Sequence, residues 1–282
     1  MAGTLYLCAT PIGNLEDMSM RAIRILKAAD LIAAEDTRNS MKLLNHFEIK
    51  TKMTSYHEYN KVEKAHFLIN KLQEGLDIAL ITDAGTPGIS DPGEEVVKRC
   101  LDQGITVTSV PGACAAVNAL ILSGLPTRRF VFEGFIPGET KEKRKVMDRI
   151  REETRTIILY EAPHHLKRTL QLLYEELGDR QICLCREMTK RYEDIHRGSL
   201  SEIIAFYEKE DPRGEYVLVL AGKDPEDILR ESQERWENVS LADHMNHYEQ
   251  MGFDRKEAMK KVAKDRGVKK RDIYQRLLND EE

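Results

Sequence analysis

The chain has 282 residues, of which 41% are hydrophobic and 32% charged, and its formal net charge is −5. This length indicates about two domains, and the hydrophobic content is sufficient for cores of normal size. The negative net charge excludes a global basic field, so any contact with nucleic acid must come from local patches. No apolar run reaches the length of a membrane span, and no basic segment precedes the first apolar residues. We therefore expect a cytoplasmic protein that contacts no membrane.

Strand-like and helical patterns alternate without a break over roughly the first 125 residues. Strands are expected at residues 4–9, 31–34, 53–56, 78–82 and 105–110. Helices are expected from Ser19, which has the character of an N-cap, to about residue 29, and after residues 35–38 to about residue 47. Further helices are expected at 62–72, at 94–103 and after 111–113. Such an alternation demands parallel strands joined by crossover helices.

Three of these strands end in loops that are rich in glycine or proline. The loops read ATPIGN at residues 9–14, TDAGTPGISDPG at 82–93 and PGAC at 111–114. In open α/β sheets, ligands bind at the carboxyl ends of strands, and glycines such as Gly85 and Gly88 let a ligand approach the main chain. Three such loops on one sheet edge predict a pocket. For the 82–93 loop the alternative is a plain connector, although it exceeds the usual length of about 2 to 6 residues.

Common site motifs are absent from the sequence. It contains no G-x-G-x-x-G, no G-x-x-x-x-G-K-[ST] and no G-x-S-x-G, so a standard dinucleotide site, a P-loop and a nucleophile elbow are not supported. The five cysteines are an odd number that lie mostly in apolar runs, which indicates buried small side chains. Cys183 and Cys185 are two residues apart, a spacing that zinc knuckles do not use. We therefore expect no metal site.

After a linker pattern at residues 124–129, the second half has fewer helices between its strands. Strands are expected at 130–135, 156–160, 181–186, 194–197 and 216–221, and helices at 140–153, 163–177 and 201–209. Antiparallel pairs must therefore enter this second sheet. Residues 141–155 hold seven basic and four acidic side chains, which indicates either a solvated helix face or a patch that contacts phosphates.

From residue 224 onward no strand pattern remains. Helices are expected at 241–250, 255–266 and 270–278, and the last two are separated by Gly267-Val268-Lys269, which is the outline of a helix-turn-helix. Residues 255–276 contain ten Lys or Arg against three acidic residues. This basic tail is either a contact for nucleic acid or a soluble helical cap.

Several segments together resemble the ribosomal RNA small-subunit methyltransferase I family, a branch of the tetrapyrrole methylases. The segments are LYLCATPIGNLEDMSMRAIRILKAADLIAAEDTR at residues 5–38, ITDAGTPGISDPG at 81–93, PGACAA at 111–116, SGLPTRRFVFEGFIP at 123–137, LYEAPHH at 159–165 and REMTK at 186–190. The resemblance covers residues 4–222, and the tail is similar to the C-terminal extension of that family.

The resemblance implies a two-domain α/β fold of the non-Rossmann, class III methyltransferase type. With the patterns above, it gives α/β domains at residues 1–122 and 123–223 and a basic helical extension at 224–282. It also implies S-adenosylmethionine as cofactor, a homodimer, and methylation of a cytidine 2′-oxygen in the decoding region of small-subunit rRNA. The partner would be this rRNA or an assembled 30S-type subunit.

By the same resemblance, the cofactor contacts the loops and two strand ends. The residues implied are Pro11, Asp83, Gly85, Thr86, Pro87, Gly88, Ile89, Pro111, Gly112, Ala113, Cys114, Tyr160 and Val217. Three positions depart from the family pattern: Cys114 stands where serine is common, Tyr59 where histidine is common and His165 where arginine is frequent. The first should change cofactor contacts mildly, and the last removes support for a phosphate contact there.

Methyl transfer to a hydroxyl also requires an acceptor for the departing proton. The candidates are Asp36, Glu58, Glu133, Glu161, Glu187 and Lys190, of which Glu133, Glu161 and Lys190 are the main ones, and each could instead form a structural ion pair. Candidates for RNA binding are Arg38, Lys190, Arg191, Lys269, Lys270 and Arg271.

Two other functions remain open at this point. A methylase of small molecules would share the pocket without needing the basic tail. A regulator that only binds nucleic acid would use the tail and leave the three loops unexplained.

Overall fold

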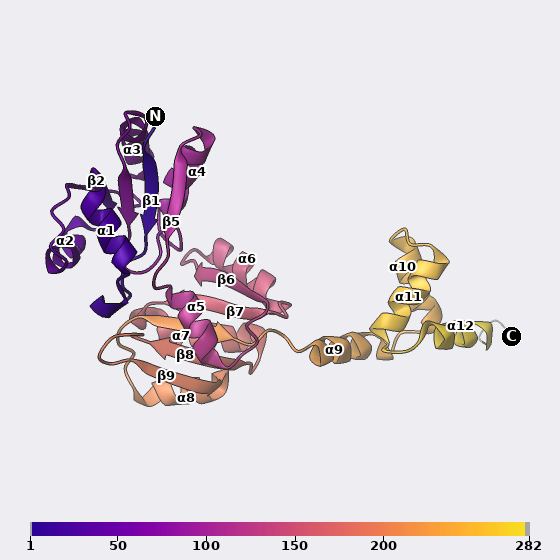
Figure 1. The fold of residues 1–282 in the computed structure, drawn as a ribbon. Coiled ribbons are helices and arrows are strands. Elements are labelled where there is room, and N and C mark those ends of the chain that lie inside the picture. Colours follow the sequence, from indigo (N-terminus) through magenta and orange to yellow (C-terminus); the bar gives the residue numbers. More distant parts are fainter. Residues whose placement is uncertain (1, 280–282) are drawn as a thin grey trace. The chain divides into compact units, whose positions relative to one another are not determined.

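The computed structural model describes residues 2–279, and the chain divides into two units (Figure 1). The first unit comprises the chain up to Ile150 together with Arg155–Ala221, and the C-terminal unit comprises Arg151–Thr154 and the chain from Gly222 onward. Within the described residues, no helix is both long enough and apolar enough to cross a membrane.

The first sheet of the first unit has five parallel strands in the order β3-β2-β4-β1-β5. Its strands are β1 (Thr4–Cys8), β2 (Leu31–Ala34), β3 (Met53–Ser55), β4 (Ile78–Ile81) and β5 (Thr106–Val110). Its helices are α1 (Met20–Ala28), α2 (Thr37–His46), α3 (Lys61–Gln73) and α4 (Gly93–Asp102), with a short 3₁₀ turn η1 (Leu15–Asp17) before α1. The expected parallel alternation is therefore confirmed.

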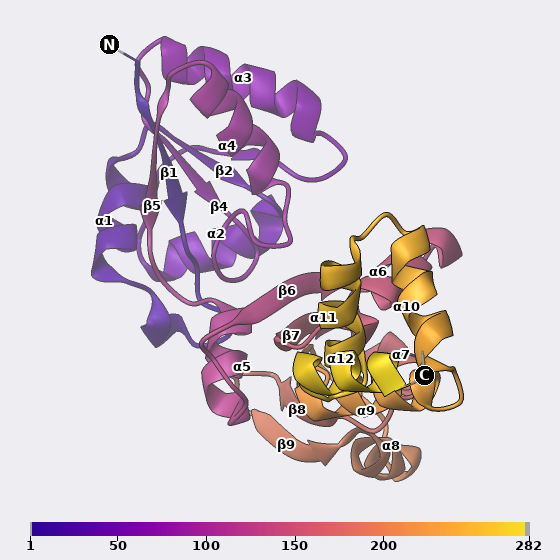
Figure 2. The same cartoon turned by 90° about the vertical axis from the view of Figure 1, so that its right-hand side faces the viewer.

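Helices cover both faces of this sheet, because its central strands are apolar on both sides (Figure 2). In β4, Ile78 and Leu80 pack with α3 and α4, whereas Ala79 and Ile81 pack with α1 and α2. The predicted cap is also present, since Ser19 Oγ accepts a hydrogen bond from the N–H of Ala22 at 3.1 Å. The ends of all five strands lie within one residue of the positions expected from the sequence.

The second sheet has five strands in the order β6-β7-β10-β8-β9, and only the β6–β7 pair is parallel. Its strands are β6 (Phe130–Phe135), β7 (Thr156–Glu161), β8 (Gln181–Arg186), β9 (Asp194–Ser199) and β10 (Tyr216–Leu220). Its helices are α5 (Ala115–Ser123), α6 (Thr140–Arg151), α7 (Pro163–Leu177) and α8 (Leu200–Lys209). The expected mixture of parallel and antiparallel pairs is confirmed.

Strand β10 shows how the two faces of this sheet are used. Tyr216, Leu218 and Leu220 pack with α6, α7 and α8, whereas Val217 and Val219 face the side that α5 covers. This alternation is the period-two pattern of a strand buried on both faces.

Helix α5 packs on the second sheet, although the sequence assigned most of it to the first domain. Its Ala116, Ala119 and Leu120 belong to the same apolar cluster as Ile158 and Val219 of that sheet. The domain boundary expected between residues 122 and 123 therefore falls inside this helix. Helix α5 is apolar on all sides, so its sequence does not indicate the sheet on which it packs.

The C-terminal unit has four helices among its described residues, which are α9 (Pro225–Glu237), α10 (Leu241–Gln250), α11 (Arg255–Asp265) and α12 (Lys270–Asn279). A small core that includes Met245, Val262 and Ile273 holds the last three together. The expected helix-turn-helix outline is present, with Gly267 at φ 64° between α11 and α12. Helix α9 was not expected from the sequence, and none of its residues is buried.

Candidate active site

The three Gly/Pro-rich loops lie side by side because β4, β1 and β5 are neighbours in the first sheet. An isolated antiparallel bridge joins Thr10 of the first loop to Gly85 of the second. Thr86 Oγ1 of the second loop donates a hydrogen bond to the carbonyl of Ala113 in the third, at 3.0 Å. A Cβ at Gly112 would lie 2.8 Å from the Cβ of Ala9, so the third loop touches the first closely. The loops form one connected surface.

The loop after β4 is held in its turn by a single carboxylate. Asp91 accepts hydrogen bonds from the N–H groups of Gly88, Ile89 and Gly93, at 2.8 to 3.2 Å. Left-handed backbone is needed here, because φ is 88° at Gly88 and 61° at Ser90. The glycine at residue 88 adopts this conformation without strain, which explains the composition of the loop.

A cavity of about 460 Å³ lies within the first unit, against these loops and the second sheet. Its lining includes seven of the residues implied as cofactor contacts, namely Asp83, Gly85, Thr86, Ile89, Cys114, Tyr160 and Val217. It also includes side chains that the sequence did not indicate, among them Ile12, Glu35, Phe135, Met188, Glu215 and Tyr216. Ile12 and Glu35 follow β1 and β2 of the first sheet, inside segments that the sequence analysis had marked, whereas the other four come from the second sheet and the loops beside its strands.

Six of the implied cofactor contacts do not line this cavity. They are Pro11, Pro87, Gly88, Pro111, Gly112 and Ala113. The structure gives several of them a supporting role, as with the carbonyl of Ala113 that receives the Thr86 hydroxyl. The sequence pattern located the loops but could not indicate which side of each loop faces the cavity.

Acidic side chains predominate in the cavity wall. Carboxylates come from Glu35, Asp83, Asp91, Glu161, Glu187 and Glu215, and Lys190 is the basic residue among the described lining. The carboxylate of Asp83 accepts hydrogen bonds from the N–H of Asp36 and the amide of Asn39, at 3.0 and 3.3 Å. Burial raises the pKa of Asp83 above its usual value despite these bonds. A cavity of this charge favours a cationic ligand.

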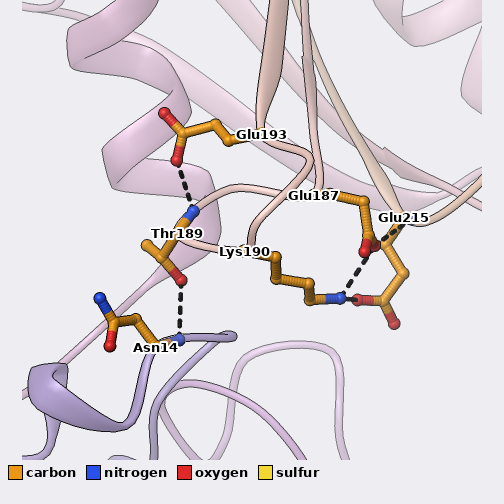
Figure 3. Close-up of polar contacts among 6 residues, drawn as sticks. All are labelled: Asn14, Glu187, Thr189, Lys190, Glu193 and Glu215. Carbon is orange, nitrogen blue, oxygen red and sulfur yellow. Dashed lines mark hydrogen bonds and ion pairs between the residues drawn. The ribbon is translucent and has the colours of Figure 1, made fainter.

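Lys190 lies between two of these carboxylates (Figure 3). Its Nζ is 2.9 Å from Glu187 Oε1 and 2.9 Å from Glu215 Oε2. Burial would lower the pKa of Lys190, but the hydrogen bonds and charges of Glu187 and Glu215 outweigh it and raise the pKa above its ordinary value. Lys190 is therefore a fixed ammonium group at neutral pH, which is the wrong protonation state for a general base.

The loop that carries Lys190 contacts the first of the Gly/Pro loops. The N–H of Asn14 donates to Thr189 Oγ1 at 3.1 Å, and the N–H of Thr189 donates to Glu193 (Figure 3). A Cβ at Gly13 would lie 2.3 Å from Cγ of Lys190, so only glycine permits this approach. Thr189 has φ 65°, a conformation that costs a non-glycine residue roughly 1 to 3 kcal/mol.

The two candidate carboxylates Glu161 and Glu133 have different surroundings. Glu161 is buried, lines the cavity, and accepts hydrogen bonds from the N–H of Ala162 and the hydroxyl of Thr169. Glu133 is not in the cavity lining and pairs with Arg149 at 2.8 Å. Glu133 is therefore placed as an ion-pair partner rather than as a group facing the cavity.

The other proton-acceptor candidates also differ in their placement. Glu187 lines the cavity, and Glu58 does not, since its carboxylate pairs with Lys61. Asp36 is likewise outside the lining and pairs with Arg38 at 2.9 Å, which holds its pKa at about 2. Asp36 consequently stays ionised as a partner of Arg38.

The RNA-binding candidates fall in two places. Arg38 is exposed, and the guanidinium of Arg191 lies 5.6 Å from the ring centre of Tyr192. Lys269, Lys270 and Arg271 lie in the C-terminal unit, immediately before and at the start of α12. Among them, Lys269 and Arg271 are exposed.

Comparisons with known proteins agree with this architecture. The profile of the family Tetrapyrrole (Corrin/Porphyrin) Methylases matches residues 4–204. A protein of Halalkalibacterium halodurans named ribosomal RNA small subunit methyltransferase I is 51% identical over 276 residues, which is 96% of this chain and 93% of that protein. Its namesake in Bacillus subtilis is 49% identical, over 96% of this chain and 93% of its own.

Solved structures show the same fold. Diphthine synthase superposes with a TM-score of 0.63 at 14% identity, over 78% of this chain and 90% of its own. Uroporphyrin-III C-methyl transferase from Thermus thermophilus complexed with S-adenyl homocysteine gives a TM-score of 0.55 at 21% identity, over 78% and 97% of the two chains. The expected two-domain, class III methyltransferase fold is confirmed. With a family match over most of its length and a relative 51% identical across nearly all of it, this chain belongs to the tetrapyrrole methylases, in the ribosomal RNA small subunit methyltransferase I family.

Proposed function

We propose that this protein transfers a methyl group from S-adenosylmethionine to the 2′-oxygen of a cytidine in the decoding region of small-subunit rRNA. One observation carries the proposal: a cavity lined by acidic side chains lies against the three Gly/Pro loops, in a chain that is 51% identical to a ribosomal RNA small subunit methyltransferase I. The cavity supports the cofactor, and the relatives support the substrate.

The residues of the cavity fit the proposed cofactor in size and charge. S-adenosylmethionine carries a sulfonium and an ammonium group against one carboxylate, so the acidic wall suits it. A volume of about 460 Å³ is in the range that holds ligands of this size. Gly85 has φ 85° and no side chain, which leaves backbone open to an adenosyl or methionyl group.

Individual residues then have distinct tasks. Asp83, Gly85 and Thr86 would hold the cofactor from the first-sheet side, and Tyr160 and Val217 from the second sheet. The cofactor supplies an electrophilic methyl group on a sulfonium. Positioning of the ribose hydroxyl in line with that group supplies acceleration worth about 7 to 11 kcal/mol in favourable cases.

Glu161 is the group proposed to receive the hydroxyl proton. Of the three main candidates, Glu133 lies outside the cavity lining, and Lys190 is held as an ammonium by Glu187 and Glu215. Glu161 faces the cavity, and the hydroxyl of Thr169 fixes one of its oxygens. Lys190 would instead hold a fixed positive charge near the reacting groups.

The decisive experiment maps the modification itself. The purified full-length protein is incubated with isotopically labelled S-adenosylmethionine and one acceptor in each of three reactions. The acceptors are naked small-subunit rRNA, assembled subunits and a tetrapyrrole. The RNA is then digested and analysed by mass spectrometry for the labelled nucleotide and atom. The proposal expects the label on the 2′-oxygen of one cytidine. Label on a base or on the tetrapyrrole, or none on RNA, would refute it.

A further inference from the structure

Strand β6 contains a bulge that determines the direction of Phe135. The pairing with β7 shifts between Phe132 and Gly134, so that Glu133 is an extra residue in β6. In a regular strand, residues three apart point to opposite faces. Here the rings of Phe132 and Phe135 both contact the ring of Tyr160, at centroid distances of 5.0 and 5.6 Å. The bulge has therefore turned Phe135 toward the cavity side of the sheet.

The bulge is fitted to the loop that follows β4. Gly134 has φ 65°, and a Cβ there would lie 3.1 Å from Oγ of Ser90, which itself has φ 61°. Both residues thus adopt a backbone conformation that is strained for most side chains, at the point where they meet. Bulges of this kind occur next to functional sites, where they redirect a side chain.

As a result, Phe135 is an exposed aromatic ring at the edge of the cavity. It lines the cavity, yet 54% of its surface remains accessible, and Tyr160 supports it from the side. Ile89, which also lines the cavity, is 41% exposed. An exposed aromatic face beside a site for a methyl donor is suited to stack against a nucleobase.

The helix that follows β6 adds positive charge. Helix α6 begins at Thr140 and follows β6 directly in the chain (Figure 2). Its Lys141, Arg144 and Lys145 are exposed, and the last two lie three and four residues after Lys141, which is helical spacing. Lys145 pairs with Glu142 at 2.7 Å. Neither Lys141 nor Arg144 has an acidic partner within residues 2–279. These two cations are free to contact phosphates.

We propose that Phe135 and the first turns of α6 form the docking surface for a single-stranded segment of the RNA substrate, which rests on the function proposed above. The base of the target nucleotide or its neighbour stacks on Phe135. Lys141 and Arg144 contact the phosphates that follow along the strand. The acidic cavity repels phosphates, whereas Lys141 and Arg144 attract them. The uncharged ribose of the target nucleotide can therefore enter the cavity while the phosphates stay outside.

One set of variants tests the stacking. Phe135→Ala removes the ring, Phe135→Leu retains apolar volume without an aromatic face, and Phe135→Tyr retains the face. Affinity for a labelled single-stranded RNA that contains a cytidine, measured by anisotropy, should fall about 5- to 150-fold in Phe135→Ala. The RNA affinity should also fall in Phe135→Leu, and it should stay at the wild-type value in Phe135→Tyr. Affinity for S-adenosylmethionine, measured by calorimetry, should be retained in Phe135→Leu.

A second variant tests the phosphate contacts. In Lys141→Gln/Arg144→Gln, the slope of log affinity against log salt should become shallower by about 1.4, since each contact to single-stranded nucleic acid contributes about 0.7. The matched control is Lys27→Gln/Lys209→Gln, which removes two exposed lysines from α1 and α8 and should leave the slope unchanged. The KM for the rRNA that the wild type methylates should rise in the α6 variant and stay unchanged in the control.

The outcomes separate this inference from the proposed function. If the wild type labels no RNA, the function fails and the docking surface fails with it. If the wild type labels RNA but the Phe135 and α6 variants keep its KM, affinity and salt slope, the docking surface alone is wrong. Loss of cofactor affinity in Phe135→Leu with unchanged RNA affinity would assign Phe135 to the cofactor and also overturn the inference.

Discussion

Thr10 and Gly85 exchange two backbone hydrogen bonds, with N···O distances of 2.8 and 3.1 Å. This pair fixes the first loop to the second beside the cavity, whose lining includes Gly85. The exchange requires φ 85° at Gly85, and a Cβ there would lie 3.3 Å from Cγ2 of Ile12 and 3.4 Å from the carbonyl of Ala113. The site therefore depends both on the left-handed backbone of Gly85 and on the absence of a side chain there.

We predict that Gly85→Val weakens S-adenosylmethionine binding by about 10- to 100-fold or more, because Gly85 lines the cavity and its new side chain would displace the neighbouring Ile12 and Ala113. Calorimetry on the folded variant gives the affinity. The control is Gly104→Val, where φ is 66° and a Cβ would meet no atom within 4 Å. This control should lose stability in the same way and keep cofactor affinity. Unchanged affinity in a folded Gly85→Val would contradict the cofactor site.

A second prediction concerns Glu161. If it accepts the hydroxyl proton, Glu161→Gln should lower kcat about 10²- to 10⁴-fold and leave cofactor affinity intact. Thr169→Val keeps the carboxylate and removes one hydrogen bond to it, which should cost about 1 to 3 kcal/mol of stability because Glu161 is buried. Single-turnover kinetics and thermal unfolding of both variants distinguish the roles. Equal losses of stability and rate in the two variants would show that Glu161 is structural.

The C-terminal unit should be sensitive to mild acid. The imidazole of His244 is buried and stacks on Trp236, with centroids 3.5 Å apart, and Arg266 Nε donates to its Nδ1 at 3.1 Å. Nδ1 must therefore be unprotonated, and Nε2 lies 3.2 Å from Asp265. Burial lowers the pKa of His244 below 6.5, and the hydrogen bond that its Nε2–H donates to Asp265 offsets this only in part.

Because the folded pKa is depressed, the unfolded chain binds more protons below pH 6.5. The stability contributed by neutral His244 is complete above that pH and is lost as the pH falls toward the lower folded value. Fluorescence of Trp236, the single tryptophan, should show a lower melting temperature at about pH 5.5 than at about pH 7.5. His244→Phe retains the stack and should melt with little pH dependence. An equally strong dependence in that variant would exclude His244 as the cause.

The basic tail should affect RNA rather than the cofactor. All described residues that line the cavity belong to the first unit, so deletion of residues 225–282 should preserve S-adenosylmethionine binding. We expect rRNA methylation to fall sharply, because the tail carries ten Lys or Arg between residues 255 and 276. The milder variant Lys269→Gln/Lys270→Gln/Arg271→Gln should weaken rRNA binding most at low salt. Full rRNA methylation by the truncated protein would show that the tail is not needed for substrate binding.

The sequence predicts the first sheet well, because glycine and proline mark its loops and apolar runs mark its strands. The residues of the second sheet that complete the cavity were mostly not predicted. Phe135 shows why: in a regular strand it would point away from the face that Phe132 occupies, and the bulge that redirects it becomes evident only from the pairing with β7. Gly134 is the one sequence signal that the bulge offers, since an isolated glycine in a strand pattern is typical of bulges.

The protonation state of Lys190 could not be predicted from the sequence either. Lys190 was a candidate for proton transfer, and only the structure shows Glu215 beside it, 25 residues away in the chain. Helix α5 was misassigned for a related reason, because its apolar sequence fits either sheet. In each case the deciding contact is with a strand or loop distant along the chain.

The order of strands in the first sheet has a consequence for folding. β1 and β5 are neighbours although about a hundred residues separate them, and β4 joins β1 across more than seventy. Parallel pairings over such separations form slowly, because loop-closure entropy must be overcome first. The Gly/Pro loops meet only when β4, β1 and β5 have all paired, so the cavity is among the last features to form. S-adenosylmethionine would therefore bind only the completed sheet and stabilise it by mass action.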